Sequence, residues 1–100
     1  MYSKNKYHLV VSLCFLLGSC SAALYLPTQT DADRMGIQTD SLLMGRKLYV
    51  YHCGACHNLH LPEQYTREDW LNEIPEMQQK AKITQEEARL ISNFVLARSK

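Results

Sequence analysis

The sequence predicts a small all-α domain built from three to four helices. Three amphipathic stretches follow one another after residue 38, and no segment alternates apolar and polar residues convincingly enough to be a strand. The chain has 100 residues, which is enough for one small domain. Hydrophobic residues make up 46% and charged residues 21%, so the composition is that of a folded protein and not of a disordered chain.

The charges of the chain nearly cancel, with 11 Lys and Arg against 10 Asp and Glu. A basic patch interleaved with aromatic residues is absent from the sequence, and we therefore expect no nucleic-acid partner. The sequence also shows no pair of acid–base groups, no activated nucleophile and no phosphate-binding loop. We expect a protein that is not itself an enzyme.

The first predicted helix begins at Thr39 or Asp40, either of which can cap it. Leu42, Gly45 and Tyr49 share its apolar face at spacings i, i+3 and i+7. A glycine inside a helix costs about 1 kcal/mol relative to alanine. A second helix crossing at close range is one reason to accept that cost, and an exposed helix that is merely weakened is the alternative.

The second predicted helix begins at Thr66, where Asp69 follows three residues later as in a capping box. Its apolar face carries Trp70, Ile74 and Met77. A proline, Pro75, lies inside this stretch and predicts a kink or a break.

The third predicted helix begins at Thr84, which forms a capping box with Glu87. Its apolar face consists of Ala88, Ile91 and Val95, with Leu90 and Phe94 beside it. We expect this helix to cross the first one at Gly45.

The N-terminal segment has the pattern of a secretory signal peptide. Lys4 and Lys6 precede an apolar stretch from Leu9 to Leu17, and the following Leu-Gly-Ser-Cys ends at Cys20. This ending resembles the lipobox of bacterial lipoproteins, whose cysteine becomes the first mature residue and carries a diacylglycerol. We expect a signal peptide over residues 1–19 and a lipidated Cys20. Ordinary cleavage a few residues later and an uncleaved membrane anchor are the alternatives.

All three fates place the rest of the chain outside the cytoplasm, because the positive N-terminus stays inside. Ser21, and not Asp, follows Cys20, which weakly favours the outer membrane over the inner one. Residues 20–38 contain Pro27 and Gly36 without clear periodicity and predict a lipidated tether. Residues 39–100 are the predicted domain, and a core of about sixty residues usually needs disulfides, a metal or a cofactor.

The sequence Cys53-Gly54-Ala55-Cys56-His57 is a C-x-x-C-H motif, which is typical of covalent haem c attachment. Two thiols at i and i+3 on a tight turn can reach the two vinyl groups on one edge of a porphyrin. His57 can then turn its imidazole under the ring and bind the iron. The exported location favours the same interpretation, because haem c is normally attached outside the cytoplasm.

Three other interpretations of the Cys53–Cys56 pair are weaker. A thioredoxin-like redox pair requires a βαβ context, whereas the flanks here are helical. A structural zinc site with His57 and His60 usually has a second ligand pair further along, and none follows. A disulfide that closes so short a loop adds little stability.

The region from Tyr49 to Val95 resembles a small monohaem class I cytochrome c domain. The residues that carry the likeness are Gly45, Tyr49, the C-x-x-C-H motif, Pro62, Trp70, Met77 and the closing Ile91, Phe94 and Val95. The run from His57 to Thr84 is also similar to small bacterial cytochromes and to cytochrome subunits of periplasmic dehydrogenases. The resemblance implies a cytochrome c fold wrapped around one haem.

The resemblance also implies roles for individual residues. Cys53 and Cys56 hold one haem c through thioethers, and His57 is the proximal iron ligand. Met77 is the expected distal ligand, which gives His/Met ligation. The carbonyl of Pro62 is expected to orient the proximal histidine through its second ring nitrogen.

The other candidates for the distal ligand are less suitably placed. Met35 lies in the tether, Met44 precedes the motif, and His52 and His60 lie too close to the motif to reach the opposite haem face. Trp70 is expected to pack on the haem or to donate its indole hydrogen to a propionate. Plain core packing is the alternative for this side chain.

The expected function is one-electron transfer on the periplasmic side of a membrane, to which the lipid anchors the protein. Expected partners are redox proteins such as a periplasmic dehydrogenase or a terminal reductase. If Met77 does not bind the iron, an open-site haem for gas sensing or peroxide chemistry is the alternative. A haem-free zinc or disulfide adaptor lipoprotein is the third possibility. Without haem, we expect the chain to be largely unfolded.

Overall fold

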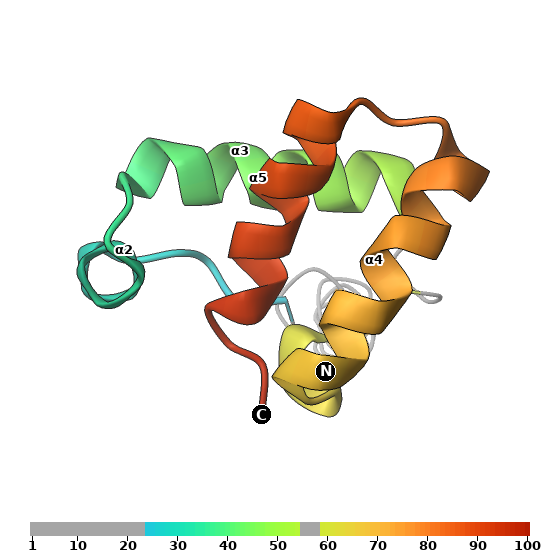
Figure 1. Ribbon diagram of the computed structural model, residues 1–100. Helices are drawn as coiled ribbons and strands as arrows, with labels where there is room; N and C mark the ends of the chain where they lie inside the picture. Colours follow the sequence, from blue (N-terminus) through green and yellow to red (C-terminus); the bar gives the residue numbers. More distant parts are fainter. Residues whose placement is uncertain (1–23, 55–58) are drawn as a thin grey trace, which may run out of the picture.

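Figure 1 shows the computed structural model, which describes residues 24–54 and 59–100. These ranges contain four α-helices, α2 (Gln29–Met35), α3 (Thr39–His52), α4 (Arg67–Ala81) and α5 (Gln85–Leu96), and the 3-10 turn η2 (Pro62–Gln64). They contain no strand, so the expected all-α class is confirmed for the part that is described. None of the helices in these ranges is long and apolar enough to cross a membrane.

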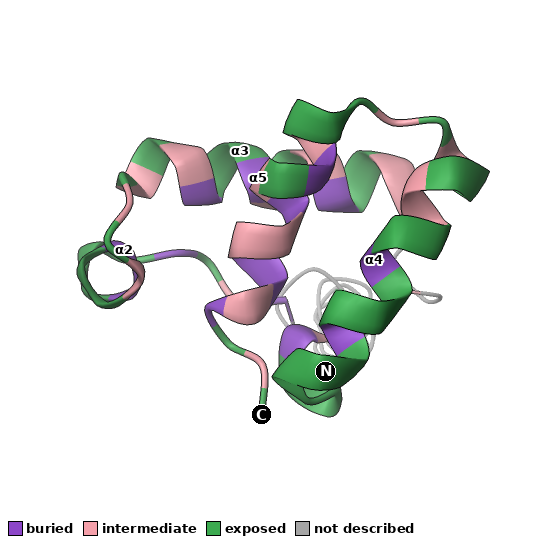
Figure 2. Cartoon of the chain, viewed as in Figure 1, coloured by how far each residue is buried: buried purple, intermediate pink, exposed green. Residues whose placement is uncertain are grey.

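The last helix, α5, is the centre of the fold. It crosses α3 and packs against α4, whereas the short α2 lies beside one end of α3 (Figure 1). The capping box predicted at Thr84 is present, because its side chain accepts from the Glu87 amide and the Glu87 carboxylate accepts from the Thr84 amide. Buried positions of α5 face those of α3 and α4 (Figure 2). They belong to one core that includes Tyr49, Trp70 and Phe94.

The crossing of α3 and α5 at Gly45 is confirmed. A Cβ atom at Gly45 would lie 2.2 Å from the carbonyl oxygen of Leu90 and 3.0 Å from the Cβ of Phe94. Any side chain at this position would therefore strike the backbone of α5. Glycine lowers the stability of α3 relative to alanine, but it lets α3 and α5 approach closely.

The second predicted helix forms as α4, but it is not broken at Pro75. The helix is continuous from Arg67 to Ala81, and the capping box of Thr66 with Asp69 is present. Pro75 is exposed, while Ile74 beside it is buried in the core. The packing of the apolar face of α4 holds the helix together across the one backbone hydrogen bond that proline cannot donate.

The expected tether over residues 20–38 differs from the structure in the part that is described. Residues 24–38 include α2, which has a capping box at Thr28 and a C-terminal cap at Gly36 with φ 68°. Leu24 is only 5% exposed and belongs to the main core. The folded unit therefore begins at least fifteen residues before the expected boundary at Thr39. Cys20 lies outside the described residues.

The buried carboxylate of Asp31 links α2 to the segment that follows α5. Asp31 is 2% exposed and accepts hydrogen bonds from Arg98 Nε at 2.8 Å and from Arg34 Nη2 at 2.9 Å. The Thr28 amide and hydroxyl also donate to it, each at 2.9 Å. These bonds, chiefly the one from Arg98, hold the pKa of Asp31 well below its ordinary value. Asp31 thus joins two segments that are far apart in the sequence.

Replacing Asp31 with asparagine is expected to lower the free energy of unfolding by about 1–3 kcal/mol at pH 7. The loss stays below that of a fully buried pair because the Arg34 and Arg98 side chains are 56% and 41% exposed. A carboxyl pKa that folding lowers stabilises the fold above the unfolded value of about 3.8, and this contribution disappears as the pH falls further. Unfolding curves between pH 7 and pH 2 should show the difference between the two proteins shrinking in acid. A difference that stays constant would contradict this account, and Asp33→Asn on the exposed side of α2 is the control.

Candidate functional site

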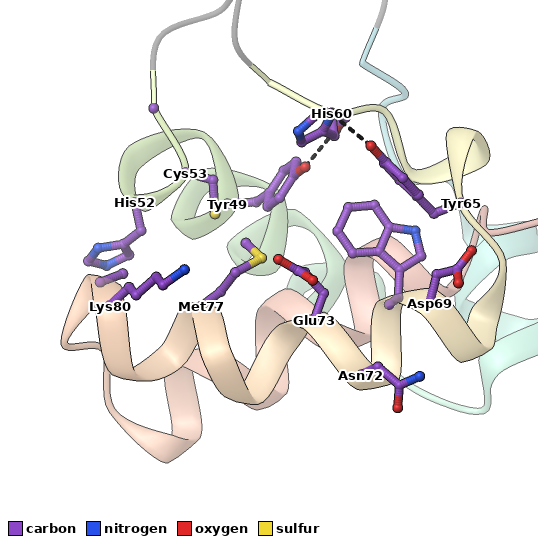
Figure 3. Close-up of a pocket in the computed structure, with 13 residues that line it drawn as sticks. Tyr49, His52, Cys53, His60, Tyr65, Asp69, Asn72, Glu73, Met77 and Lys80 are labelled. Atoms are coloured by element: carbon purple, nitrogen blue, oxygen red, sulfur yellow. Dashed lines mark hydrogen bonds between the residues drawn. The ribbon is translucent and has the colours of Figure 1, made fainter.

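A pocket of about 810 Å³ lies between the C-terminal end of α3, the loop around His60 and α4 (Figure 3). Its volume is in the range of about 300–1,000 Å³ that is usual for sites of small molecules and cofactors. The lining combines two sulfur-containing side chains with aromatic and polar residues: Tyr49, His52, Cys53, Gly54, His60, Tyr65, Asp69, Trp70, Asn72, Glu73, Met77, Lys80 and Ala81.

Cys53 and Met77 bring their sulfur atoms to this pocket from two different helices (Figure 3). Cys53 ends α3, and its amide donates to the Tyr49 carbonyl at 2.9 Å. Met77 follows Trp70 at i+7 and Ile74 at i+3 on α4, so the buried face of that helix turns it inward. Both residues are partly buried and pack against the core. The structure therefore brings together one predicted thioether-forming thiol and the predicted distal ligand.

The thiol of Cys53 is in an apolar environment. Burial raises the pKa of Cys53 to about 11, so the thiol is protonated at neutral pH. Redox-active cysteines of the thioredoxin type have a lowered pKa, because the thiolate is the reactive form. Burial acts in the opposite direction at Cys53.

The hydrogen bond of Trp70 differs from the propionate contact that was one of the roles expected for it. Its indole nitrogen donates a hydrogen bond of 2.8 Å to the carbonyl oxygen of Pro62, and the side chain is only 3% exposed. The indole has a single N–H, so this hydrogen is already bound inside the protein and is not offered to a propionate. The ring lies edge-on to Tyr49 and Tyr65, with centroids 6.1 Å and 5.5 Å away. This arrangement corresponds to the alternative of core packing, at the wall of the pocket.

The loop that carries His60 is fixed to the pocket by two tyrosines. The hydroxyl of Tyr49 donates to the His60 carbonyl at 2.5 Å, and the hydroxyl of Tyr65 lies 3.2 Å from His60 Nδ1 (Figure 3). Burial raises the pKa of Tyr49, so this phenol remains a hydrogen-bond donor at all ordinary pH values. The two contacts place the backbone that follows the C-x-x-C-H motif against the end of α3.

The sequence analysis set His52 and His60 aside as distal ligands, but both line the pocket. His52 lies three residues after Tyr49 on α3, and its Nε2 is 3.1 Å from a carboxylate oxygen of Glu87. Helical periodicity could have found it, because Tyr49, His52 and Cys53 lie on one side of a helix. His60 has no such signal, since it lies in a loop and is placed by the two tyrosines.

The remaining predicted residues are not brought to the pocket or are not described. Met44 is 46% exposed on α3, and Met35 packs against a separate cluster of Ala32, Leu42 and Ala97. Cys56 and His57 lie outside the described residues. Among the residues that are described, no three His, Cys, Asp or Glu side chains are grouped so as to hold a metal ion.

The donor types at the pocket fit a haem c group. A thiol at Cys53 and a thioether at Met77 are two of the four groups that covalent attachment and His/Met ligation require, and the other two, Cys56 and His57, lie outside the described residues. Buried aromatic walls from Tyr49 and Trp70 supply the apolar surroundings that a porphyrin needs.

A comparison with protein family models, with curated proteins and with solved structures finds no match to this chain.

Proposed function

We propose that this protein carries single electrons on one covalently attached haem c. The observation that supports this most is the joint presence of Cys53 and Met77 at one pocket of about 810 Å³. The C-x-x-C-H motif begins at this same cysteine. Covalent attachment at Cys53 and binding of the iron by Met77 would therefore take place in the same pocket.

Four residues would hold the haem. Cys53 and Cys56 would form the thioethers, and His57 and Met77 would be the axial ligands of the iron. The bound haem would supply a ferric/ferrous couple, and its potential depends on the axial ligands and on exclusion of water.

Two further residues act on this site through the backbone. Trp70 keeps the Pro62 carbonyl in place through its indole hydrogen bond. A carbonyl oxygen has two lone pairs, so Pro62 can still accept from the second ring nitrogen of His57. The role of Pro62 is in this way compatible with the bond to Trp70.

The proposed location is the periplasmic face of a membrane, with Cys20 as a lipidated N-terminus and the outer membrane favoured. The proposed partners are redox proteins such as a periplasmic dehydrogenase or a terminal reductase, which would dock over a small interface. The sequence pattern of residues 1–20 supports the export and the anchor.

The covalent attachment can be tested on the full chain coexpressed with haem c maturation factors. After unfolding in acid and organic solvent, the haem should stay with the polypeptide, and a tryptic peptide with residues 53–57 should carry the haem mass. Extraction of all haem into the organic phase would contradict the proposal. A Cys53→Ser, Cys56→Ser variant is the matched control, and its corresponding tryptic peptide should carry no haem mass.

Replacing Met77 with leucine is expected to open one axial position of the haem iron. Leucine keeps nearly the same apolar volume, so the cost in stability should stay below about 1.5 kcal/mol. The reduction potential should fall by on the order of 0.1 V or more, and the weak far-red band of the oxidised protein should disappear. The measurement is a redox titration followed by absorption.

Met44→Leu is the matched control for this substitution, because Met44 is 46% exposed on α3 and does not line the pocket. It should leave the band and the potential unchanged. A Met77→Leu protein with an unaltered spectrum would show that another residue binds the iron.

A further inference from the structure

The first described residues are held firmly by the domain, although they follow the proposed lipid site closely. Leu24 is buried in the main core, and the Tyr25 ring stacks on Phe94 with centroids 4.7 Å apart. Arg46 donates from Nε to the Tyr25 carbonyl at 3.0 Å. These contacts fix Leu24 and Tyr25 on the domain. The position of these two residues is called the exit point, because the chain continues from it towards Cys20.

The distance from this point to Cys20 is short. Only residues 21–23 separate Cys20 from Leu24. Even a fully extended chain spans at most about 14 Å over these four steps. A flexible tether of the length expected from the sequence, residues 20–38, would have a root-mean-square reach of about 25 Å. Cys20 therefore lies within about 14 Å of Leu24, which keeps the domain close to the bilayer that the lipid enters.

The surface next to this exit point carries exposed apolar side chains. Leu26 is 65% exposed and lies two residues after the buried Leu24. On α3, Leu43 and Val50 are 38% and 42% exposed and flank Arg46 at i−3 and i+4. Since Arg46 binds the backbone of residues 24 and 25, this side of α3 runs beside the exit point.

We propose that the domain rests directly on a phospholipid bilayer through these residues. The anchor-side face is defined as Leu26, Leu43, Lys47 and Val50. Lys47 is exposed between the two apolar residues of α3, and its charge complements anionic lipid headgroups. Exposed leucine and valine near a lysine are the residue types that enter the headgroup boundary. The inference rests on the proposed lipidation of Cys20, which brings the bilayer within reach.

A docked domain has a fixed orientation, unlike a domain on a long tether. The pocket would then face any redox partner from one direction only. Electron exchange would then be confined to partners that can reach the pocket at its fixed position relative to the bilayer.

The test uses the full lipidated protein in vesicles of zwitterionic and anionic phospholipid. Single substitutions Leu26→Cys and Leu43→Cys place thiols on the anchor-side face, and Gln85→Cys places one on the exposed first turn of α5 as a control. The rate of reaction with a membrane-impermeant maleimide is measured for each, with the unsubstituted chain as background. Each variant is also made with a Gly-Ser linker of about 20 residues between Ala23 and Leu24, which adds a reach of about 25 Å.

The linker should speed labelling at Leu26→Cys and Leu43→Cys by about tenfold, as expected when roughly nine tenths of the molecules are docked, and should leave Gln85→Cys unchanged. Equal rates with and without the linker at all three positions would overturn the proposal. Flotation with the vesicles and the mass of the N-terminal peptide are measured on the same samples. A protein that lacks the lipid and does not float would overturn the proposed anchor at Cys20. The labelling and flotation results do not bear on the haem, which is measured separately by absorption.

Discussion

Replacing Gly45 with alanine is expected to destabilise the protein by about 3 kcal/mol, at the upper end of the usual range for overpacking. The new Cβ would lie 2.2 Å from the Leu90 carbonyl oxygen, so α3 and α5 must move apart. Because the obstacle is backbone, no side-chain rotation can relieve it. The measurement is the free energy of unfolding in denaturant, followed by far-ultraviolet circular dichroism.

The sign of this effect separates the two interpretations of the glycine. If Gly45 merely weakened an exposed helix, alanine would stabilise the protein by up to about 1 kcal/mol. Met44→Ala is the control on the same helix, because Met44 is 46% exposed, and it should change the free energy of unfolding by less than about 0.5 kcal/mol. A stabilised Gly45→Ala protein would contradict the close crossing.

The second large effect is expected from removing both cysteines of the motif. A protein with Cys53→Ala and Cys56→Ala cannot hold haem covalently, and we expect it to be largely unfolded. The described residues 24–54 and 59–100 have a small core, and their pocket of about 810 Å³ would lack the proposed haem. Binding that is specific to the folded state stabilises it, so loss of the ligand removes that contribution.

Circular dichroism and hydrogen exchange measure this effect. The variant should show weak helical signal and little amide protection, whereas the haem-loaded protein should be strongly helical. Met44→Ala with intact cysteines is again the control. A well-folded double variant with cooperative unfolding would contradict the claim that the haem completes the core.

Much of the helical core could be predicted because it depends on local patterns. The helix starts at Thr66 and Thr84 follow from capping boxes, and both boxes are present. The crossing at Gly45 follows from a small residue on an apolar helix face, opposite the predicted face of α5. Met77 shares the apolar face of α4 with Trp70 and Ile74, and it lines the pocket.

The N-terminal part was not predicted because its stability comes from distant contacts. Thr28 and Asp31 have the same capping-box spacing as the later helices, but α2 has only 7 residues and no apolar periodicity. Asp31 is held by Arg98, which is 67 positions away in the sequence. Such pairs cannot be read from a single sequence.

The site was predicted in its residue types more than in its hydrogen bonds. The sequence analysis named Pro62 and Trp70 and gave a haem propionate as one possible acceptor of the indole hydrogen, whereas this hydrogen binds the Pro62 carbonyl. The position of His60 depends on the hydroxyl groups of Tyr49 and Tyr65, which meet it only in the folded chain.

The most direct test of the proposed function is the absorption spectrum of the purified full chain, made with haem c maturation factors. Reduced-minus-oxidised spectra are recorded with and without carbon monoxide. We expect the sharp reduced bands of haem c, a weak far-red band in the oxidised form and no change with carbon monoxide, because Met77 keeps the sixth position. A spectrum that shifts with carbon monoxide would contradict ligation by Met77. A colourless, folded protein would contradict the haem itself.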